Sequence, residues 1–160
     1  MRGKVLSLKG FSLIEMLIAI VIIVILSLVL RANLRPATNR DNLNFTTEKI
    51  VASLRDAQTR SVAKTAGAVW GVHLQNSTTS PFFSTFKGSY SATSGLSRYP
   101  LPFGVQFVTS SIAQGGALDV TFAKLSGLPL ASSSIVLKLV SGGTVVATSG
   151  ITISARGLIY

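Results

Sequence analysis

The chain has a long apolar run near its N-terminus, and the segments after it repeat their apolar residues at other spacings. Residues 11–30 read FSLIEMLIAIVIIVILSLVL, in which Glu15 is the single charged residue. At 1.5 Å per residue, a helix of this length extends about 30 Å, which is the thickness of the hydrocarbon core of a bilayer. The pattern therefore predicts a helix over 11–30 that is able to span a membrane.

After the apolar run, the pattern predicts an amphipathic continuation of the helix over 31–67. Four apolar residues recur at spacings of seven, four and three, which places them on one helical face. They are Leu43, Ile50, Leu54 and Ala57. Pro36 lacks a backbone donor and is expected to kink the helix, while Gly67 is expected to end it. Asp56 and Arg60 stand four residues apart and are expected to pair on the solvent side.

From residue 68 the helical period gives way to alternation, which predicts a β-rich head over 68–160. Trp70, Val72 and Leu74 share one face of the first strand. Six further strands are expected, at Phe82–Lys87, Gly104–Thr109, Leu118–Lys124, Ile135–Val140, Thr144–Thr148 and Ile151–Ala155. The stretch 75–102 is rich in Ser and Thr and is expected to be the most irregular surface. The fold class is therefore α+β, a long N-terminal helix packed on a β-rich globular head.

The composition removes most enzyme classes. The chain has 160 residues, 15 Lys+Arg against 5 Asp+Glu, one His and no Cys. Without a thiol there is no disulfide, cysteine nucleophile or thiolate metal site. His73, expected on the solvent side of its strand, has no clustered acid or second His to complete a metal site. We therefore expect no catalytic residue, no metal, no cofactor and no enzymatic activity.

The apolar segment has two simpler explanations, a secretory signal peptide and a plain membrane anchor. Leu30-Arg31-Ala32 does not fit the small residues required at a signal-peptide cleavage site. An acidic group in a lipid-facing helix costs roughly 2 to 3 kcal/mol unless it has a partner. A plain anchor has no reason to carry Glu15, so the segment calls for a more specific explanation.

The residues around the start of the run supply that explanation. Lys9-Gly10-Phe11-Ser12-Leu13-Ile14-Glu15 resembles the processing site of type IV prepilins and of the pseudopilins of type II secretion. The resemblance implies that residues 1–10 are a leader, that prepilin peptidase cuts between Gly10 and Phe11, and that Phe11 is then N-methylated. It also implies that Glu15 pairs with the N-terminal amine of a neighbouring subunit and sets its register during assembly.

Physical chemistry supports this pairing. An α-amine has a pKa of about 8 and is largely cationic at neutral pH. It can therefore neutralise a carboxylate inside a low-dielectric helix bundle. The resemblance further implies partners and a location: prepilin peptidase/N-methyltransferase, other pilin or pseudopilin subunits, an inner-membrane assembly platform, and membrane lipid before assembly. The protein would cross the bacterial inner membrane once, with its N-terminus in the cytoplasm and its head outside.

The head carries a less specific resemblance. A helix through 54–63, the strand at Trp70, and the segments 120–127 and 151–159 are together similar to the H-type minor pseudopilins, the GspH/FimT-like group. The resemblance implies a non-enzymatic minor subunit of a type II secretion system or a type IV pilus. Some members of this group bind DNA through arginines near the C-terminus, so a DNA-binding minor pilin of an uptake pilus is the alternative function.

The basic residues do not favour DNA. Residues 155–160 contain one arginine, Arg156, which offers a single phosphate contact and is expected on the exposed face of a terminal strand. Arg31, Arg35 and Arg40 lie beside the apolar run, where cations more often meet phospholipid head groups. A membrane-anchored enzyme or binding module with a pilin-like leader is a further alternative, and a deep polar pocket in the head would support it.

Overall fold

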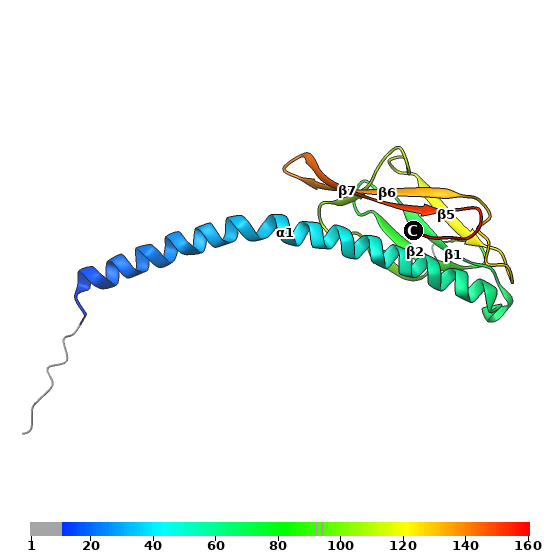
Figure 1. Cartoon of the computed structure of the whole chain (residues 1–160), viewed down its shortest axis with the longest axis horizontal. Coiled ribbons are helices and arrows are strands. Elements are labelled where there is room, and N and C mark those ends of the chain that lie inside the picture. The colour runs from blue at the N-terminus through cyan, green and yellow to red at the C-terminus, as the bar shows by residue number, and fades with distance from the viewer. Residues whose placement is uncertain (1–10, 92, 94) are drawn as a thin grey trace, which may run out of the picture. The chain divides into compact units, whose positions relative to one another are not determined.

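A computed structural model describes residues 11–91, 93 and 95–160, with the side chains of 29–38 outside the description. Helix α1 (Leu13–Val62) is followed by a short 3-10 turn η1 (Thr65–Gly67). The strands are β1 (Trp70–Gln75), β2 (Phe82–Lys87), β3 (Gly95–Pro100), β4 (Val105–Phe107), β5 (Ala117–Phe122), β6 (Ser133–Ser141) and β7 (Thr144–Ile153) (Figure 1). The chain divides into two compact units, residues 1–38 and 39–160.

In the second unit, α1 presents its predicted stripe to the head. Leu43 is 2% exposed, and Ile50, Leu54 and Ala57 are fully buried. The intervening positions are mainly polar and face outward, and Asp56 pairs with Arg60 at 2.7 Å as predicted. The helical period of the sequence thus decides which side of the helix meets the sheets.

The strands of the head form two antiparallel sheets. The first has the order β3-β2-β1-β5 and the second the order β4-β6-β7. Trp70 pairs with Lys87 on one side and with Phe122 on the other, so β1 lies in the middle of its sheet. Side chains from both sheets and from α1 join one apolar cluster, which includes Leu54, Phe122 and Ile135. The predicted α+β architecture is confirmed.

Polar contacts fasten α1 to two loops of the head. The side-chain amide of Gln58 donates to the carbonyl oxygens of Gly127 and Gly157, each at 2.9 Å. Gly157 has φ +80°, and a Cβ there would lie 2.9 Å from Gln58 Nε2. A side chain at Gly157 would therefore strain the backbone and crowd this contact. Arg55 Nη2 adds a hydrogen bond to the Ile159 carbonyl at 3.1 Å.

Three boundary predictions are wrong. Helix α1 ends at Val62, and Gly67 closes η1 rather than α1. Lys64 and Ala66 take left-handed conformations, so the chain already turns before it reaches the glycine. Strand β3 lies inside 75–102, which was predicted to be irregular, because pairing with β2 orders a segment that has no alternation of its own. The two strands predicted at 144–148 and 151–155 are the single strand β7, because both pair with β6.

Candidate functional site

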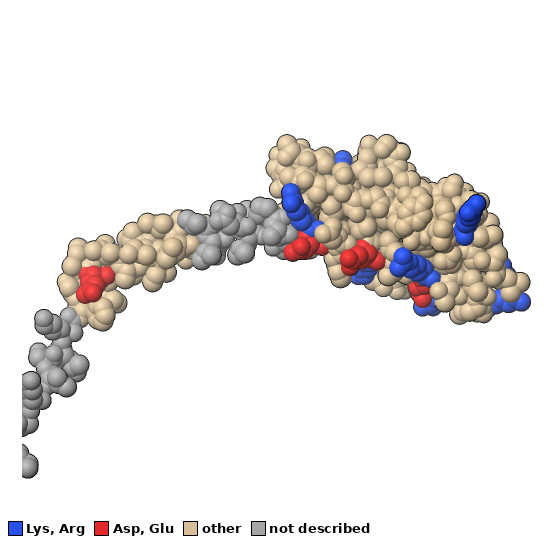
Figure 2. Space-filling model, viewed as in Figure 1, with Lys and Arg blue, Asp and Glu red and all other residues tan. Residues whose placement is uncertain are grey.

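The described part of the first unit is a helix surface without a covering partner. All residues from 13 to 28 are exposed, and most are large and apolar, such as Leu13 at 84% and Leu28 at 64% exposed. Figure 2 shows this stretch as a tan surface with one red patch, in agreement with its single acidic residue. Soluble monomers rarely expose so large an apolar surface, so lipid or other helices are expected to cover it.

The start of α1 places Glu15 in the first helical turn. The backbone amides of Glu15 and Met16 donate to the Ser12 carbonyl oxygen at 3.0 and 3.2 Å. Ser12 therefore lies at the N-terminal end of the helix, three residues before Glu15. The helix dipole favours an acidic residue at this end. Glu15 is exposed, and its carboxylate is open to a charge brought by another molecule.

Two other predicted site residues lie outside what the structure describes. Gly10 belongs to residues 1–10, which the structure does not describe. Of the two residues at the predicted cleavage bond, only Phe11 is described, and its side chain is 78% exposed. Pro36 falls within 29–38, whose side chains are not described. Cleavage at Gly10 and the kink at Pro36 therefore stay predictions.

A membrane span requires a helix that is both long and apolar. Among the described residues, no helix meets both requirements. The predicted membrane segment, 11–30, includes residues 29 and 30, which lie outside the described side chains.

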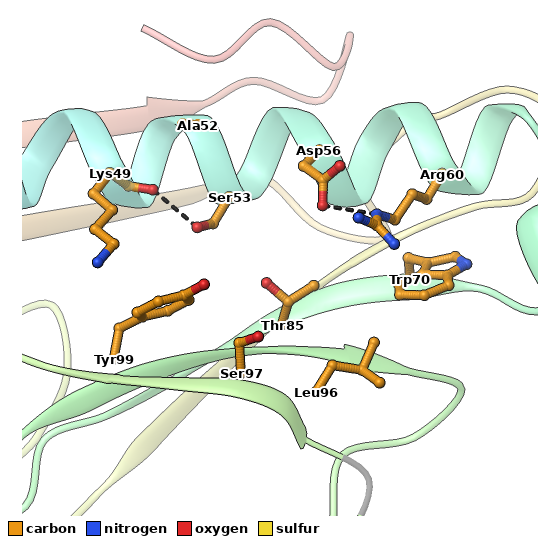
Figure 3. Close-up of a pocket in the computed structure, with 10 residues that line it drawn as sticks. All are labelled: Lys49, Ala52, Ser53, Asp56, Arg60, Trp70, Thr85, Leu96, Ser97 and Tyr99. Atoms are coloured by element: carbon orange, nitrogen blue, oxygen red, sulfur yellow. Dashed lines mark hydrogen bonds and ion pairs between the residues drawn. The ribbon is translucent and has the colours of Figure 1, made fainter.

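The head has a groove between α1 and the edge strand β3, with a volume of about 530 Å³ (Figure 3). Lys49, Asp56 and Arg60 line it from the helix, and Leu96 and Tyr99 line it from β3. Lys49 Nζ lies 4.0 Å from the centre of the Tyr99 ring, at one end of the groove. At the other end, the Arg60 guanidinium lies 4.9 Å from the centre of the Trp70 ring and also pairs with Asp56.

The groove is lined by charged, aromatic and hydroxyl-bearing residues. The cations of the groove contact aromatic rings or pair with Asp56. Its hydroxyl-bearing residues are Ser53, Thr85, Ser97 and Tyr99. In the part of the chain that the structure describes, no group of three or more His, Asp or Glu residues could hold a metal ion.

His73 was predicted on the solvent side of its strand, and that prediction is wrong. It is 4% exposed, because the Tyr90 ring stacks on its imidazole with the ring centres 3.4 Å apart. Its Nδ1 lies 2.5 Å from an Asp119 carboxylate oxygen, and its Nε2 lies 3.3 Å from Gln75 Oε1. The prediction failed because both faces of β1 are covered, and the contact with Tyr90 leaves no signal in the alternation of the strand.

Besides Arg60 in the last turn of α1, four exposed cations from segments outside the helix lie near its C-terminal end, and we call these four the basic end. They are Lys64, Lys87, Lys124 and Arg156. Ser61 lies close to the backbone of the first three. It accepts hydrogen bonds from the backbone amides of Lys64 and of Leu125, the residue after Lys124. It also accepts one from the amide of Trp70, whose cross-strand partner is Lys87. The turn that carries Arg156 reaches the same region through the Gln58 contact to Gly157.

The structure thus gathers cations that are scattered in the sequence, although not all of them. Arg98 lies elsewhere, on β3 over the Phe82 ring, and Lys138 lies within β6. Arg156 lies in a turn rather than on the predicted terminal strand, since β7 ends at Ile153. On the face of the head seen in Figure 2, the blue side chains stand apart from one another and form no continuous patch.

The exposed apolar helix that begins with an acidic first turn also has a recognisable sequence. Residues 8–30 match the prokaryotic N-terminal methylation motif. The motif supports a type IV pilin-like protein, a pilin or pseudopilin that prepilin peptidase processes and that assembles with other pilin subunits. The motif indicates a membrane-anchored subunit that is later assembled into a filament, a kind of protein that is usually non-enzymatic.

The motif covers residues 8–30 and leaves the head to be explained on its own. No curated protein matches the chain, and no solved structure does. The head of this pilin-like chain therefore has to be understood from its own contacts.

Proposed function

We propose that this chain is a minor pilin or pseudopilin of a type II secretion system or type IV pilus. Residues 1–10 would be removed as a leader, by cleavage between Gly10 and Phe11, and Phe11 would then be N-methylated. The observation that carries the proposal is the methylation motif at 8–30, placed on a helix whose apolar side chains are exposed from 13 to 28. The similarity of the head segments to H-type minor pseudopilins supports the minor role.

The mechanism follows from what must cover the helix. Before assembly, lipid covers the apolar segment 11–30, with the N-terminus in the cytoplasm and the head outside the inner membrane. On an assembly platform, the subunit leaves the bilayer and neighbouring apolar helices replace the lipid. This exchange keeps the apolar surface out of water throughout. Burial by itself therefore gives little preference for one axial position of a helix relative to its neighbours. The continuation over 31–67 and the head at 68–160 would then contact neighbouring subunits.

Glu15 supplies the register. A carboxylate enclosed by apolar helices is unfavourable unless a cation reaches it, and the amine created by cleavage is such a cation. Since Glu15 lies in the first turn, only one axial position of a neighbouring helix brings that amine within reach. Lys9, the nearest side-chain cation before Phe11, belongs to the leader and is removed by cleavage.

Substitution of Glu15 tests this mechanism. We expect Glu15→Gln to be cleaved and methylated normally but to enter filaments roughly tenfold less than the wild type, which corresponds to about 1.4 kcal/mol. The amide keeps the size of the side chain and removes the charge that the amine needs. Intact mass of the membrane form and quantitative immunoblots of sheared filaments measure the two steps separately.

Glu15→Asp is the matched control, because it keeps the charge on a shorter side chain. It should restore a substantial part of the incorporation that Glu15→Gln loses. Equal incorporation of the Gln variant and the wild type would contradict the proposed role of Glu15, and it would leave the assignment of the leader unaffected.

The basic end favours a second candidate function, a DNA-binding minor pilin of an uptake pilus. Lys64, Lys87, Lys124 and Arg156 are exposed and lie near one another. Phosphate contacts by such cations give binding that does not depend on sequence and weakens steeply with salt. On the face of the head that Figure 2 shows, the cations stand apart and give DNA no continuous path.

A gel-shift titration with residues 40–160 tests this second candidate. If the basic end binds duplex DNA, the shift should appear at low salt, and replacing Lys64, Lys87 and Lys124 with Gln should lower the salt slope by about 0.9 for each phosphate that is no longer neutralised. Arg98→Gln with Lys138→Gln is the control and should change the slope little. Absence of any shift at low salt would remove the DNA function.

A further inference from the structure

The turn before β4 holds an aromatic side chain in solvent. Phe103 is 99% exposed, more than any other large apolar residue that the structure describes. Val105 N donates to the Pro102 carbonyl oxygen at 3.1 Å across the turn, and Gly104 has φ +85°. A type II turn requires a positive φ at this position, which glycine adopts without strain. The backbone of the turn therefore keeps Phe103 at its outer corner.

The β6–β7 turn lies beside the turn of Phe103. Val140 N, on β6, donates to the Gly104 carbonyl oxygen at 2.8 Å, which fastens the first turn to this hairpin. Val140 pairs with Val145 across the hairpin, and the glycines 142–143, both with positive φ, close it. Val145 is 56% exposed. Phe103 and Val145 therefore lie at the same end of the β4-β6-β7 sheet, and we call these two residues the apolar rim.

The apolar rim lies at the end of the head where α1 enters it. A cleft of about 230 Å³ is lined by Asn39 of α1, by Phe103 and by the glycines 142–143. Figure 1 shows the tip of the β6–β7 hairpin extending past the other strands of the head. Leu125 belongs to the opposite end, because its N–H donates to the carbonyl oxygen of Ser61, in the last turn of α1.

This end of the head is also close, along the chain, to the segment that is anchored in the membrane. Asn39 follows residue 30 by nine positions, which a helix covers in about 14 Å. The head groups of a bilayer occupy roughly the first 5 to 8 Å beyond its hydrocarbon core. With 11–30 in that core, Asn39 stands within about 10 Å of the bilayer surface. A bend at Pro36 would change the direction of the head and not this limit.

The charges near the apolar rim suit a bilayer surface. Arg31, Arg35 and Arg40 lie between the apolar run and the head, and no acidic residue occurs from 16 to 40. Arg40 is exposed, as is the first acidic residue after it, Asp41. The segments that carry the two turns, 101–107 and 139–150, contain no charged residue. Apolar side chains beside basic residues are typical of protein surfaces that lie in the interface of an anionic bilayer.

We propose that the apolar rim docks on the bilayer that anchors this chain. Phe103 and Val145 enter the boundary between head groups and acyl chains, and Arg40 contacts lipid phosphates. Lipid is the occupant because the anchor keeps the rim beside a bilayer in every subunit that is not yet assembled. Docking holds the head in one orientation until the subunit is extracted into a filament. The inference rests on the proposed function only in that 11–30 lies in the membrane.

Fluorescence quenching tests the proposal on the full chain, and the absence of native Cys leaves one labelling site. Val145→Cys carries an environment-sensitive dye, in vesicles of phosphatidylethanolamine and phosphatidylglycerol with some lipids spin-labelled near the head group. We expect blue-shifted emission and strong quenching by the labelled lipids. Leu125→Cys is the matched control, 63% exposed at the opposite end of the head, and should show neither effect.

Substitution of Phe103 supplies the complementary test. Phe103→Asp, combined with the dye at Val145→Cys, should lower the fraction of docked heads roughly tenfold, because a carboxylate is costly to place among lipids. Leu125→Asp with the same dye position should leave the quenching unchanged. Unchanged fluorescence of Trp70 would show that Phe103→Asp still folds, as expected for a fully exposed side chain.

Three results would overturn the proposal. They are no quenching at Val145→Cys, equal quenching at Leu125→Cys, and a blue shift without lipid quenching that is lost when more lipid dilutes the chains, which indicates contact between copies. Alkaline carbonate extraction reports the insertion of 11–30 separately. An extracted chain would contradict the proposed function and this inference with it, whereas an inserted chain without quenching would contradict this inference alone.

Discussion

Replacing Gly10 with Val is expected to leave residues 1–10 attached to the chain. The methylation motif covers this position, and the proposed cut lies directly after it. Glycine offers the peptidase an unhindered and flexible bond, whereas the β-branched Val restricts the backbone and fills the space beside it. Intact mass and N-terminal sequence from native membranes should show a wild type that begins at methylated Phe11 and a variant that begins at Met1.

Gly3→Val is the matched control for this experiment. It makes the same chemical change inside the leader but outside the matched residues 8–30, so cleavage should be normal. Filaments should contain Gly3→Val at the wild-type level and lack Gly10→Val. If the wild type itself begins at Met1, or is cut beyond Leu30, the proposed assembly mechanism is wrong.

Replacing Leu54 with Ala is expected to destabilise the head by about 2 to 5 kcal/mol. Leu54 is fully buried between α1 and the sheets, so the shorter side chain buries less apolar surface and leaves a cavity. The head fragment 39–160 contains every residue of the apolar cluster and suits the measurement. Urea unfolding can be followed by the fluorescence of Trp70, the single tryptophan, which is 4% exposed when folded.

Phe45→Ala provides the comparison on the same helix. Phe45 is larger than Leu54 but 63% exposed, so its truncation should change stability by less than about 0.5 kcal/mol. If the two variants lose equal stability, α1 is not packed on the sheets through the predicted stripe. A lower midpoint with an unchanged slope is the expected pattern for Leu54→Ala.

Local sequence patterns predicted the parts of the head that depend on periodicity. The stripe through Leu43 and Leu54 is buried because residues three, four and seven apart share a helical face. Trp70, Val72 and Leu74 enter the same apolar cluster because side chains two residues apart share one face of a strand. At the N-terminus, the motif around Gly10 and Glu15 indicated the pilin-like class, because its residue types and spacing are recognisable without a structure.

The predictions failed where the outcome depends on residues distant in sequence. Strand β3 exists because β2 supplies its hydrogen bonds, and β7 is one strand because β6 pairs with both of its halves. His73 is buried because Tyr90 stacks on it, although the two residues lie on different segments of the chain. None of these contacts leaves a periodic signal within the segments involved.

By itself, the sequence determined the apolar helix, the charge within it, the processing motif and the presence of a β-rich head. Each depends on composition or spacing between near neighbours in the chain, where backbone geometry alone relates the side chains. Only the tertiary structure decided that Lys64, Lys87 and Lys124 share one end of the head and that β6 pairs with both halves of β7. Those properties depend on which strands pair, and strand pairing is decided by long-range contacts.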